Sequence, residues 1–554
     1  MRLSGADITI KLLERQGVEV IAGIPGGSNL PLYDSLYKSS IKHILTRHEQ
    51  GAAFIAQGIA RSTGSAAVCF ATSGPGATNL LTAIADAKLD SVPIIAITGQ
   101  VPSSLIGTDA FQEVDTYGLT IPITKHNFFI HSVDELFRII PEAFKVATSG
   151  RPGPVVIDIP KDIQMEEFEF DNWPIIEAEN VINEFDEQLI EQAAEMINKS
   201  EKPLLYIGGG IISSNASNIL GEFARKNSIP VTTTLMALGS FPEDDSLYLG
   251  MLGMHGARYT NILFSEADLI LALGVRFDDR ATGNVAKFCP NAKIIHIDID
   301  KAEIDKIKKS YLSIQGDICS ILDKMITLIN DDKRAHWISE VEKKKQENPF
   351  LLPNSSDCFH PINIIKNVSK LVNKDTIITT DVGQHQMWTA QVYPFKFPRT
   401  FLTSGGLGTM GFGLPAAIGA AIANPNKKIV CFSGDGSFLM NIQELATLAD
   451  LDLDVKVIIL NNGHLGLVRQ QQEILYNEHY IASKFITNPD FSVISQGFGI
   501  ESYSLEKNTN PAKLLYAALN TKGPCVINVP INSCENVLPI VPPGCGNLEM
   551  IGGE

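Results

Sequence analysis

The sequence predicts an α/β protein made of three doubly wound domains with mainly parallel sheets. Short apolar runs ending in Gly, Pro or Asp alternate with stretches of helical period along the whole chain, which is typical of parallel α/β sheets. The length of 554 residues predicts roughly three or four domains of about 150 residues each. A hydrophobic content of 44% is enough to build a full core in each of them.

The first block of predicted strands defines a domain over residues 1–165. Its apolar runs are Val18–Gly23, Ala66–Ala71, Pro93–Thr98 and Pro154–Ile159. The block ends in the acidic, proline-containing stretch Met165–Glu187, where we expect a linker.

The second and third blocks repeat the same pattern over residues 188–335 and 360–540. A charged helix, Ser339–Glu347, and the Pro/Asn/Ser-rich stretch Pro353–Pro361 separate them. The predicted strands are Pro203–Gly208, Asp268–Leu273 and Lys293–Asp298 in the second block, and Asp375–Thr380, Lys428–Ser433, Val455–Leu460 and Pro524–Val529 in the third.

Charge and cysteine content exclude several classes of protein. The 45 basic and 62 acidic residues give a net charge of −17, which disfavours nucleic acid or an anionic membrane as the main partner. The 8 cysteines are scattered without C-x-x-C spacing and are interpreted as reduced thiols. Met1–Gly17 is unlike a targeting segment, and no uncharged apolar run approaches the ~18 residues that a membrane span needs. We therefore expect a soluble, cytoplasmic protein.

Two polar turns in the third block predict a site for Mg²⁺ and a diphosphate. Gly434-Asp435-Gly436 closes one predicted strand, and Asn461-Asn462 closes the next, 27 residues later (462−435). Ligands bind at the carboxyl ends of parallel strands, and Mg²⁺ takes oxygen ligands such as a carboxylate and an amide carbonyl. The glycines allow close approach of a phosphate. Either motif alone is usually an ordinary turn.

Motifs in the first block identify the diphosphate through a family resemblance. Arg47–Gln50 and Thr72–Asn79, taken with the two polar turns, resemble the thiamine-diphosphate-dependent decarboxylases and carboligases. The match narrows to the large, catalytic subunits of acetohydroxyacid synthases and extends from about Leu3 to the C-terminal segment. The motifs that narrow it are Ile106–Glu113, Ser149–Pro154, Gly253–Gly256 and Arg276–Arg280. The resemblance implies that 1–165 binds the pyrimidine of the cofactor, 188–335 binds FAD, and 360–540 binds the diphosphate and Mg²⁺.

The resemblance also implies a catalytic role for Glu49. A 2-ketoacid loses CO₂ only when an electron sink accepts the carbanion, and the thiazolium ring is that sink. A carboxylate at N1′ of the aminopyrimidine helps the cofactor to lose its C2 proton, and Glu49 matches this position. A surface glutamate on a polar turn is the other interpretation.

The implied metal ligands are Asp435, Asn462 and the backbone carbonyl of His464. Met410 is implied to be the wedge that bends the cofactor, although methionines are more often core filler. The other implied thiamine diphosphate contacts are Pro25, Gly26, Gly383, Gln384, His385, Gly408, Gly434, Gly436, Ser437, Leu465, Gly466 and Leu467.

For the second block the residues alone leave the ligand open. Gly208-Gly209-Gly210 after an apolar run lacks the G-x-G-x-x-G spacing, so a tight turn is about as good an interpretation as a dinucleotide site. The resemblance implies FAD in a structural role, because the carboligation has no net redox change. Its implied contacts are Arg151, Gly208, Gly209, Gly210, Thr234, Leu235, Met236, Met254, His255, Gly256, Arg276, Asp298 and Asp317.

The acceptor pocket must hold the carboxylate of a second 2-ketoacid, and Arg280 is our candidate because a guanidinium pairs with a carboxylate bidentately. An ion pair with Asp278 or Asp279 is the alternative. Gln112 is the third implied catalytic residue, with Glu49 and Arg280. The implied substrate pocket further contains Phe111, Lys125, Lys161, Met254, Leu467 and Gln471, of which the lysines could also be surface residues.

One position departs from most of the family, which has Trp where this chain has Gln471. The indole narrows the acceptor pocket in favour of 2-oxobutanoate, and such apolar selectivity amounts to about 1–3 kcal/mol. We therefore expect little preference for 2-oxobutanoate over pyruvate. Gln471 and Val541–Gly544 resemble the bacterial isozyme I type.

The implied activity is acetolactate synthesis: pyruvate is decarboxylated and joined to pyruvate or 2-oxobutanoate, at the start of branched-chain amino acid synthesis. The resemblance implies a homodimer or dimer of dimers whose subunits share each site, and a separate small regulatory subunit. A pyruvate oxidase of the same superfamily and a non-catalytic scaffold paralogue are the alternatives. The scaffold would be expected to have lost Glu49 or the metal ligands, and this chain has both.

Overall fold

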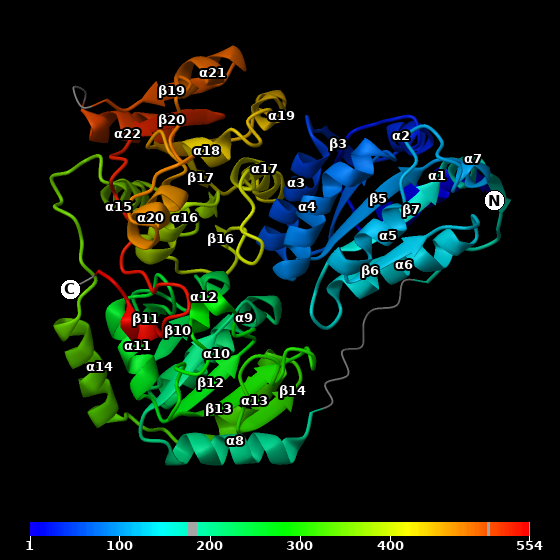
Figure 1. The fold of residues 1–554 in the computed structure, drawn as a ribbon. Helices are drawn as coiled ribbons and strands as arrows, with labels where there is room; N and C mark the ends of the chain where they lie inside the picture. Colours follow the sequence, from blue (N-terminus) through cyan, green and yellow to red (C-terminus); the bar gives the residue numbers. More distant parts are fainter. Residues whose placement is uncertain (176–184, 507–509, 553–554) are drawn as a thin grey trace.

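Three parallel six-stranded sheets, each flanked by helices, make up the protein, which confirms the predicted fold class (Figure 1). The computed structural model describes residues 1–175, 185–506 and 510–552. In the part of the chain described, no helix is long and apolar enough to cross a membrane.

The N-terminal sheet has the strand order β3-β2-β4-β5-β7-β6. Its strands are β2 (Val20–Gly23), β3 (Lys42–Leu45), β4 (Ala67–Ala71), β5 (Ile94–Gln100), β6 (His126–Phe129) and β7 (Val155–Pro160). Its helices are α1 (Gly5–Arg15), α2 (Leu30–Tyr37), α3 (Glu49–Thr63), α4 (Pro75–Leu89), η1 (Ser103–Leu105), α5 (Thr116–Thr120), η2 (Ile121–Ile123), α6 (Glu135–Thr148) and α7 (Lys161–Met165).

The stretch expected to be a linker, Met165–Glu187, is partly regular structure, so this expectation was too simple. β8 (Glu167–Glu169) pairs antiparallel with β1 (Arg2–Ser4) and ties this segment to the start of the chain. A partner so distant in sequence leaves no local signal in a three-residue strand. Residues 176–184 lie outside the described residues.

The central sheet has the order β11-β10-β9-β12-β13-β14. Its strands are β9 (Pro203–Ile207), β10 (Val231–Thr233), β11 (Tyr248–Met251), β12 (Leu269–Leu273), β13 (Lys293–Asp298) and β14 (Leu312–Gln315). Its helices are α8 (Glu187–Lys199), α9 (Gly210–Ser213), α10 (Ser217–Lys226), η3 (Leu235–Ala237), α11 (Arg258–Glu266), α12 (Asp279–Thr282), α13 (Ile318–Leu328) and α14 (Ala335–Glu347).

The C-terminal sheet has the order β16-β15-β17-β18-β20-β19. Its strands are β15 (Ile377–Thr380), β16 (Phe401–Leu402), β17 (Ile429–Gly434), β18 (Val455–Asn461), β19 (Glu501–Ser504) and β20 (Cys525–Pro530). Its helices are α15 (Pro361–Leu371), α16 (Gln384–Val392), α17 (Gly413–Ala423), α18 (Asp435–Phe438), α19 (Glu444–Leu451), α20 (Gly466–Leu475), α21 (Phe491–Gly497) and α22 (Pro511–Asn520), and the tail after β20 contains η4 (Asn547–Glu549).

Strand order distinguishes the central sheet from the other two. Each outer sheet reads 2-1-3-4-6-5 when its strands are renumbered along the chain, whereas the central sheet reads 3-2-1-4-5-6, the order of dinucleotide-binding folds. The order reverses between β2 and β4, between β9 and β12, and between β15 and β17. Ligands of doubly wound sheets bind at such points, so the topology marks three places for sites.

The first and third sheets share a hydrophobic core through α3 and α17, which lie side by side in Figure 1. Glycines allow this close contact, because a Cβ on Gly58 would collide with the Ala416 backbone and one on Gly419 with that of Ile55. The rings of Phe54 and Phe412 meet edge to face across it at 5.3 Å. The two outer domains therefore pack as one unit within the chain.

The segment after β20 leaves the C-terminal sheet and returns to the central domain, where its end lies in Figure 1. Val541 donates its backbone N–H to the carbonyl of Met254 at 2.9 Å, and Asn547 donates to the carbonyl of Ala281 at 2.9 Å. This tail therefore contacts both α12, which carries Arg280, and the segment after β11, which carries Met254.

Candidate active site

The two polar turns of the C-terminal sheet lie next to each other in the structure. The register of β17 and β18 pairs Gly434 with Leu460, which places Asp435 level with Asn461 and one residue from Asn462. Asp435 is buried, and its carboxylate accepts the backbone N–H of Gly463 at 2.7 Å. Burial raises the pKa of Asp435 to about 6. A carboxylate, an amide and nearby main-chain carbonyls therefore converge at this edge of the sheet.

His385 lies beside this turn with an unsatisfied nitrogen. Its ring packs against Gly434, where a Cβ would approach the His385 Nδ1 to 2.9 Å. The ring is buried, which lowers its pKa to about 3 and keeps it neutral. Its buried Nε2 has no hydrogen-bond partner among the described residues. A buried donor or acceptor of this kind is costly unless something pairs with it, so the site is suited to a polar ligand.

Residues 483–485 pack over the loop that follows β18. The backbone N–H of Phe485 donates to the carbonyl of Gly463 at 2.9 Å, and Leu465 donates to the carbonyl of Ser483 at 2.7 Å. His464 donates its backbone N–H to the Asn462 side-chain oxygen at 3.0 Å. These contacts fix the backbone around the candidate metal ligands.

Met410 lies half-buried in an irregular segment between β16 and α17. Gly408 in this segment has a φ of +69°, which favours glycine, and among the described residues a Cβ there would meet Val382 alone within 4 Å, at 3.9 Å. Asp381, at the end of β15, accepts the Gly411 N–H at 2.7 Å and the Ser433 hydroxyl at 3.0 Å. Asp381 thus joins the Met410 segment to the end of β17.

Glu49 is the first residue of α3 and only 9% exposed. Its carboxylate accepts a hydrogen bond from Asn79 at 2.9 Å, which fixes its orientation. Next to it, the buried carboxylate of Glu444 accepts the Arg47 backbone N–H at 3.1 Å. No role was predicted from the sequence for Asn79, Asp381 or Glu444. Asn79 ends the Thr72–Asn79 motif, so its position was the one local signal available.

The other predicted catalytic and substrate-pocket residues of the N-terminal domain are Phe111, Gln112, Lys125 and Lys161. Gln112 has a φ of +61°, and Gly74 makes room for it because a Cβ on Gly74 would come within 2.9 Å of its backbone. Phe111 is 87% exposed in the single chain. Lys161 follows β7, at the same edge of the sheet as Glu49. Lys125 instead precedes β6 at the opposite edge and donates to the Ser149 carbonyl, so the chain does not bring it to Glu49.

The predicted flavin contacts of the central domain gather at one edge of its sheet. Each of the six strands is followed at its carboxyl end by at least one of them: Gly208–Gly210 after β9, Thr234–Met236 after β10, Met254–Gly256 after β11, Arg276 after β12, Asp298 at the end of β13, and Asp317 after β14. The sequence pattern alone did not reveal this grouping, because it depends on the parallel pairing of the strands.

Some of the predicted flavin contacts have structural roles that do not depend on a ligand. A Cβ on Gly208 would collide with the Gly274 carbonyl, so close packing of β9 and β12 requires this glycine whatever binds. Asp317 caps α13 by accepting the Ser320 N–H at 2.9 Å. Arg151, from the N-terminal domain, pairs with Asp300 at 3.3 Å and lies beside the central sheet.

Burial lowers the pKa of His255 to about 4, and its Nδ1 lies 3.1 Å from the Pro539 carbonyl. The neutral ring therefore donates from Nδ1, and its Nε2 is left as an acceptor.

The candidate acceptor residues are exposed in the single chain. The Arg280 side chain is 65% exposed, with Nη1 3.8 Å from the Met254 sulfur and Nε 3.7 Å from an Asp279 oxygen. An exposed pair between adjacent residues contributes little stability, so it does not explain this arginine. Gln471, on α20, is also exposed, and Leu467 is half-buried.

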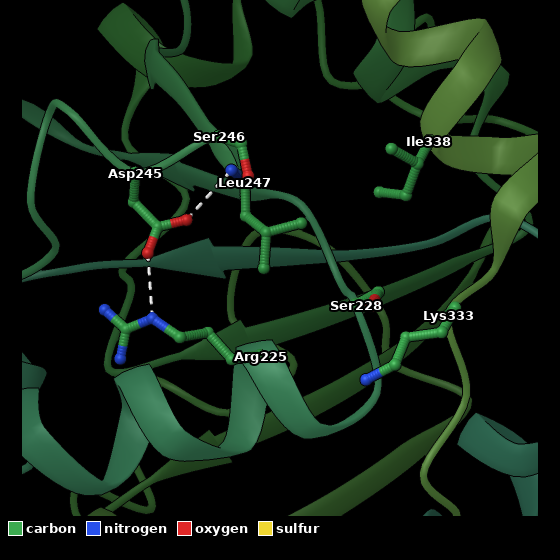
Figure 2. Close-up of a pocket in the computed structure, with 7 residues that line it drawn as sticks. All are labelled: Arg225, Ser228, Asp245, Ser246, Leu247, Lys333 and Ile338. Carbon is green, nitrogen blue, oxygen red and sulfur yellow. Dashed lines mark hydrogen bonds and ion pairs between the residues drawn. The ribbon is translucent and has the colours of Figure 1, made fainter.

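A surface hollow of about 380 Å³ lies on the central domain, away from all of these residues (Figure 2). Arg225, one of its cationic residues, is already paired with Asp245 at 2.8 Å. None of its lining residues is a predicted site residue, so the hollow adds nothing to the candidate site.

Comparison with known proteins adds an independent line of support. Family models match at residues 3–119 (thiamine pyrophosphate enzyme, N-terminal TPP binding domain), 190–325 (thiamine pyrophosphate enzyme, central domain) and 381–529 (thiamine pyrophosphate enzyme, C-terminal TPP binding domain). The chain is 54% identical to the acetolactate synthase isozyme 1 large subunit of Escherichia coli (strain K12), over 100% of this chain and 98% of that protein. It is 46% identical to the isozyme 2 large subunit of the same organism, over 99% of both chains. It is also 46% identical to the acetolactate synthase large subunit of Pyropia yezoensis, over 99% of this chain and 95% of that one.

Proposed function

The chain belongs to the acetolactate synthase large subunits, and from this premise we propose how its residues carry out the reaction. The protein is an acetolactate synthase, which makes 2-acetolactate from two molecules of pyruvate and 2-aceto-2-hydroxybutanoate from pyruvate and 2-oxobutanoate. Full-length identity of 54% to the isozyme 1 large subunit carries this conclusion. Glu49, Asp435 and Asn462 are all present, which is consistent with a catalytic chain.

We propose that thiamine diphosphate binds with its diphosphate at the ends of β15, β17 and β18. Two features fit it: the unpaired buried Nε2 of His385 and the open space beside Gly408, next to Met410. The oxygens of Asp435, Asn462 and the His464 carbonyl are the ligand type that Mg²⁺ prefers. When bound, the cofactor supplies the electron sink for decarboxylation.

Glu49 would hold a proton against the pyrimidine ring of the cofactor. Asn79, on α4, orients the carboxylate, and the burial of Glu49 limits its contact with water. Gln112, on the neighbouring loop, would contact the reacting groups.

Arg280 would bind the carboxylate of the acceptor 2-ketoacid, with Met254 packed beside it. Gln471 is smaller than the tryptophan found in most of the family, so it leaves the proposed acceptor pocket wider and does not favour the extra methyl group of 2-oxobutanoate. Phe111, Lys161 and Leu467 complete the proposed pocket, whereas Lys125 lies at the opposite edge of its sheet from Glu49. Phe111 and Arg280 are mostly exposed in the single chain, and a second subunit would cover them.

FAD in a non-redox role is proposed for the central domain. Its support is the 3-2-1-4-5-6 strand order and the gathering of the predicted contacts at the carboxyl ends of all six strands. Gly209, Met236 and Arg276, three of the residues that would hold it, are partly exposed.

We also propose that the active unit is a homodimer or dimer of dimers, with Glu49 and Asp435 of each site on different subunits. A separate small subunit would regulate it, since the relatives are named large subunits. The domain limits 1–165, 188–335 and 360–540 and a cytoplasmic location stay predictions.

A product assay tests the function. Purified protein is given pyruvate, thiamine diphosphate and Mg²⁺, with and without FAD, and acetolactate and oxygen uptake are measured. Acetolactate that forms without oxygen uptake and only when FAD is present supports both the activity and the flavin. Acetyl phosphate or acetate with oxygen uptake would instead identify a pyruvate oxidase.

A further inference from the structure

The segment 404–411, which carries Gly408 and Met410, has neither helical nor strand hydrogen bonds of its own. Its backbone groups must therefore be satisfied from elsewhere, and its shape is set by whatever satisfies them. Within the C-terminal domain, Gln386 donates to the Ser404 carbonyl at 2.9 Å and Asp381 accepts the Gly411 N–H at 2.7 Å. These contacts hold the two ends of the segment, and its middle is held by a different domain.

Two acidic residues of the N-terminal domain bind residues of the segment between 404 and 409. Asp86, on α4, accepts the hydroxyl of Thr409 at 2.9 Å and the hydroxyl of Ser404. Asp90, the residue after α4, accepts the N–H groups of Gly405 at 2.9 Å and Gly406 at 2.7 Å. Thr409 also donates its backbone N–H to the Ser404 hydroxyl at 2.8 Å, so Asp86 fixes a closed loop of hydrogen bonds.

Within the described part of the chain, a single arginine pairs with both carboxylates. Arg61, on α3, lies 3.0 Å from Asp86 and 2.9 Å from Asp90, with its side chain 7% exposed and both carboxylates fully buried. Burial and the nearby charge of Asp90 raise the pKa of Asp86. One guanidinium neutralises only one of the two carboxylates. The hydroxyl and N–H donors of segment 404–411 stabilise the remaining negative charge by hydrogen bonds. The segment is thus fixed by charge-assisted bonds.

The cluster of Arg61, Asp86 and Asp90 is not needed to hold the two outer domains together. α3 and α17 already join the outer domains through an apolar core, and Arg47 and Glu444 join them again near Glu49. Replacing a buried ionic cluster by apolar residues of the same size is often neutral or stabilising, so stability alone does not account for this cluster. The cluster is directed at residues 404, 405, 406 and 409, immediately before Met410.

We propose that Asp86 is a positioning residue for the thiamine diphosphate site, acting through Ser404 and Thr409 to fix segment 404–411 and hence the place of Met410. The inference rests on the proposed function for the role of Met410. It means that the N-terminal domain shapes the diphosphate-binding domain of its own chain, and in the proposed dimer it also supplies Glu49 to the site of the other subunit.

The test compares Asp86→Asn with Thr409→Val and with Asp7→Asn as control. Asp7 is a carboxylate of the same domain that also accepts two serine hydroxyls, from Ser4 and Ser35 at 2.8 Å each, but it lies on α1. Asp86→Asn keeps the shape and removes the charge. Thr409→Val removes one donor from the other side of the same contact, and serves if Asp86→Asn does not fold.

Amide hydrogen exchange of the full chain without added cofactor gives the first readout. We expect exchange in 404–411 to rise about tenfold or more in Asp86→Asn and less in Thr409→Val, the size expected for a lost charge-assisted hydrogen bond. Asp7→Asn should leave it unchanged. Unchanged exchange of 404–411 in both site variants would overturn the proposal. An equal rise across α3 and α17 would also overturn it, because Asp86 would then only hold the domains together.

Acetolactate formation gives the second readout. The concentration of thiamine diphosphate for half-maximal activity should rise about tenfold in Asp86→Asn, with the KM for pyruvate nearly unchanged. A raised KM for pyruvate with an unchanged cofactor requirement would contradict the positioning role. Failure of the wild-type protein to make acetolactate would refute the proposed function, and hydrogen exchange would still decide whether Asp86 fixes the segment.

Discussion

Gly434→Ala is the sharpest perturbation of the diphosphate-binding edge. Gly434 has a φ of −97°, which any residue adopts, so the backbone does not oppose the substitution. The added Cβ would lie 2.9 Å from the His385 Nδ1 and 3.0 Å from its Cε1, closer than van der Waals contact allows. The His385 ring must therefore move away from the place where its unpaired Nε2 faces the proposed ligand.

The expected size follows from the cost of overpacking. Inserting a methyl group into a well-packed site costs about 1–3 kcal/mol. If the ring relaxes in the free protein and the cofactor must restore its position, the concentration of thiamine diphosphate for half-maximal activity should rise about 5- to 150-fold. The assay is acetolactate formation at saturating pyruvate and Mg²⁺, titrated with the cofactor.

Gly497→Ala is the matched control, because a Cβ at this helical glycine has no neighbour within 4 Å among the residues that the structure describes. It should leave the cofactor requirement unchanged. A Gly434→Ala protein that needs no more thiamine diphosphate than Gly497→Ala would refute the assignment of the cofactor to this edge of the sheet.

Three further predictions concern the acceptor, pH and assembly. Gln471→Trp should raise the preference for 2-oxobutanoate over pyruvate about tenfold or more in a competition assay, and an unchanged product ratio would contradict it. Burial raises the pKa of Asp158 to about 7, so the folded protein favours the protonated carboxyl. The contribution of Asp158 to the free energy of unfolding is therefore largest at low pH and is lost as the pH rises toward 7. Wild-type stability relative to Asp158→Asn should thus fall by about 1.4 kcal/mol per pH unit between pH 5 and 6.5, measured by denaturant unfolding, and parallel pH profiles would disprove it. Glu49→Gln and Asp435→Asn should each be inactive alone but should recover about one quarter of wild-type activity when dissociated, mixed and reassembled, whereas no recovery would place each site within one subunit.

The fold was predictable because most strands carry their own signal. β13 and β18 are apolar runs bounded by turn residues, and the structure begins both strands at the predicted residue. β1, β8 and β10 have only three residues each, and their partners are set by tertiary contacts that no local pattern encodes. The order of the strands, which separates the central sheet from the outer two, depends on the same long-range pairing.

The candidate site follows the same division. Asp435 and Asn462 were predictable because each directly follows a strand, and parallel strands bring their ends together. Asp381 and Asp86 were not, because their roles arise from hydrogen bonds to a segment far away in the sequence. A buried aspartate has no sequence pattern of its own, and its partners appear only after the domains have packed.

The stoichiometry of the reaction tests the central claim most directly. Carbon dioxide and acetolactate are measured as pyruvate is consumed, with thiamine diphosphate and Mg²⁺ each present or omitted. We predict about one acetolactate and one carbon dioxide for every two pyruvate molecules, and no consumption when the cofactor is omitted. Pyruvate loss with acetaldehyde or an acetyl product in place of acetolactate, or turnover that does not need thiamine diphosphate, would contradict the assignment of this chain as an acetolactate-forming carboligase.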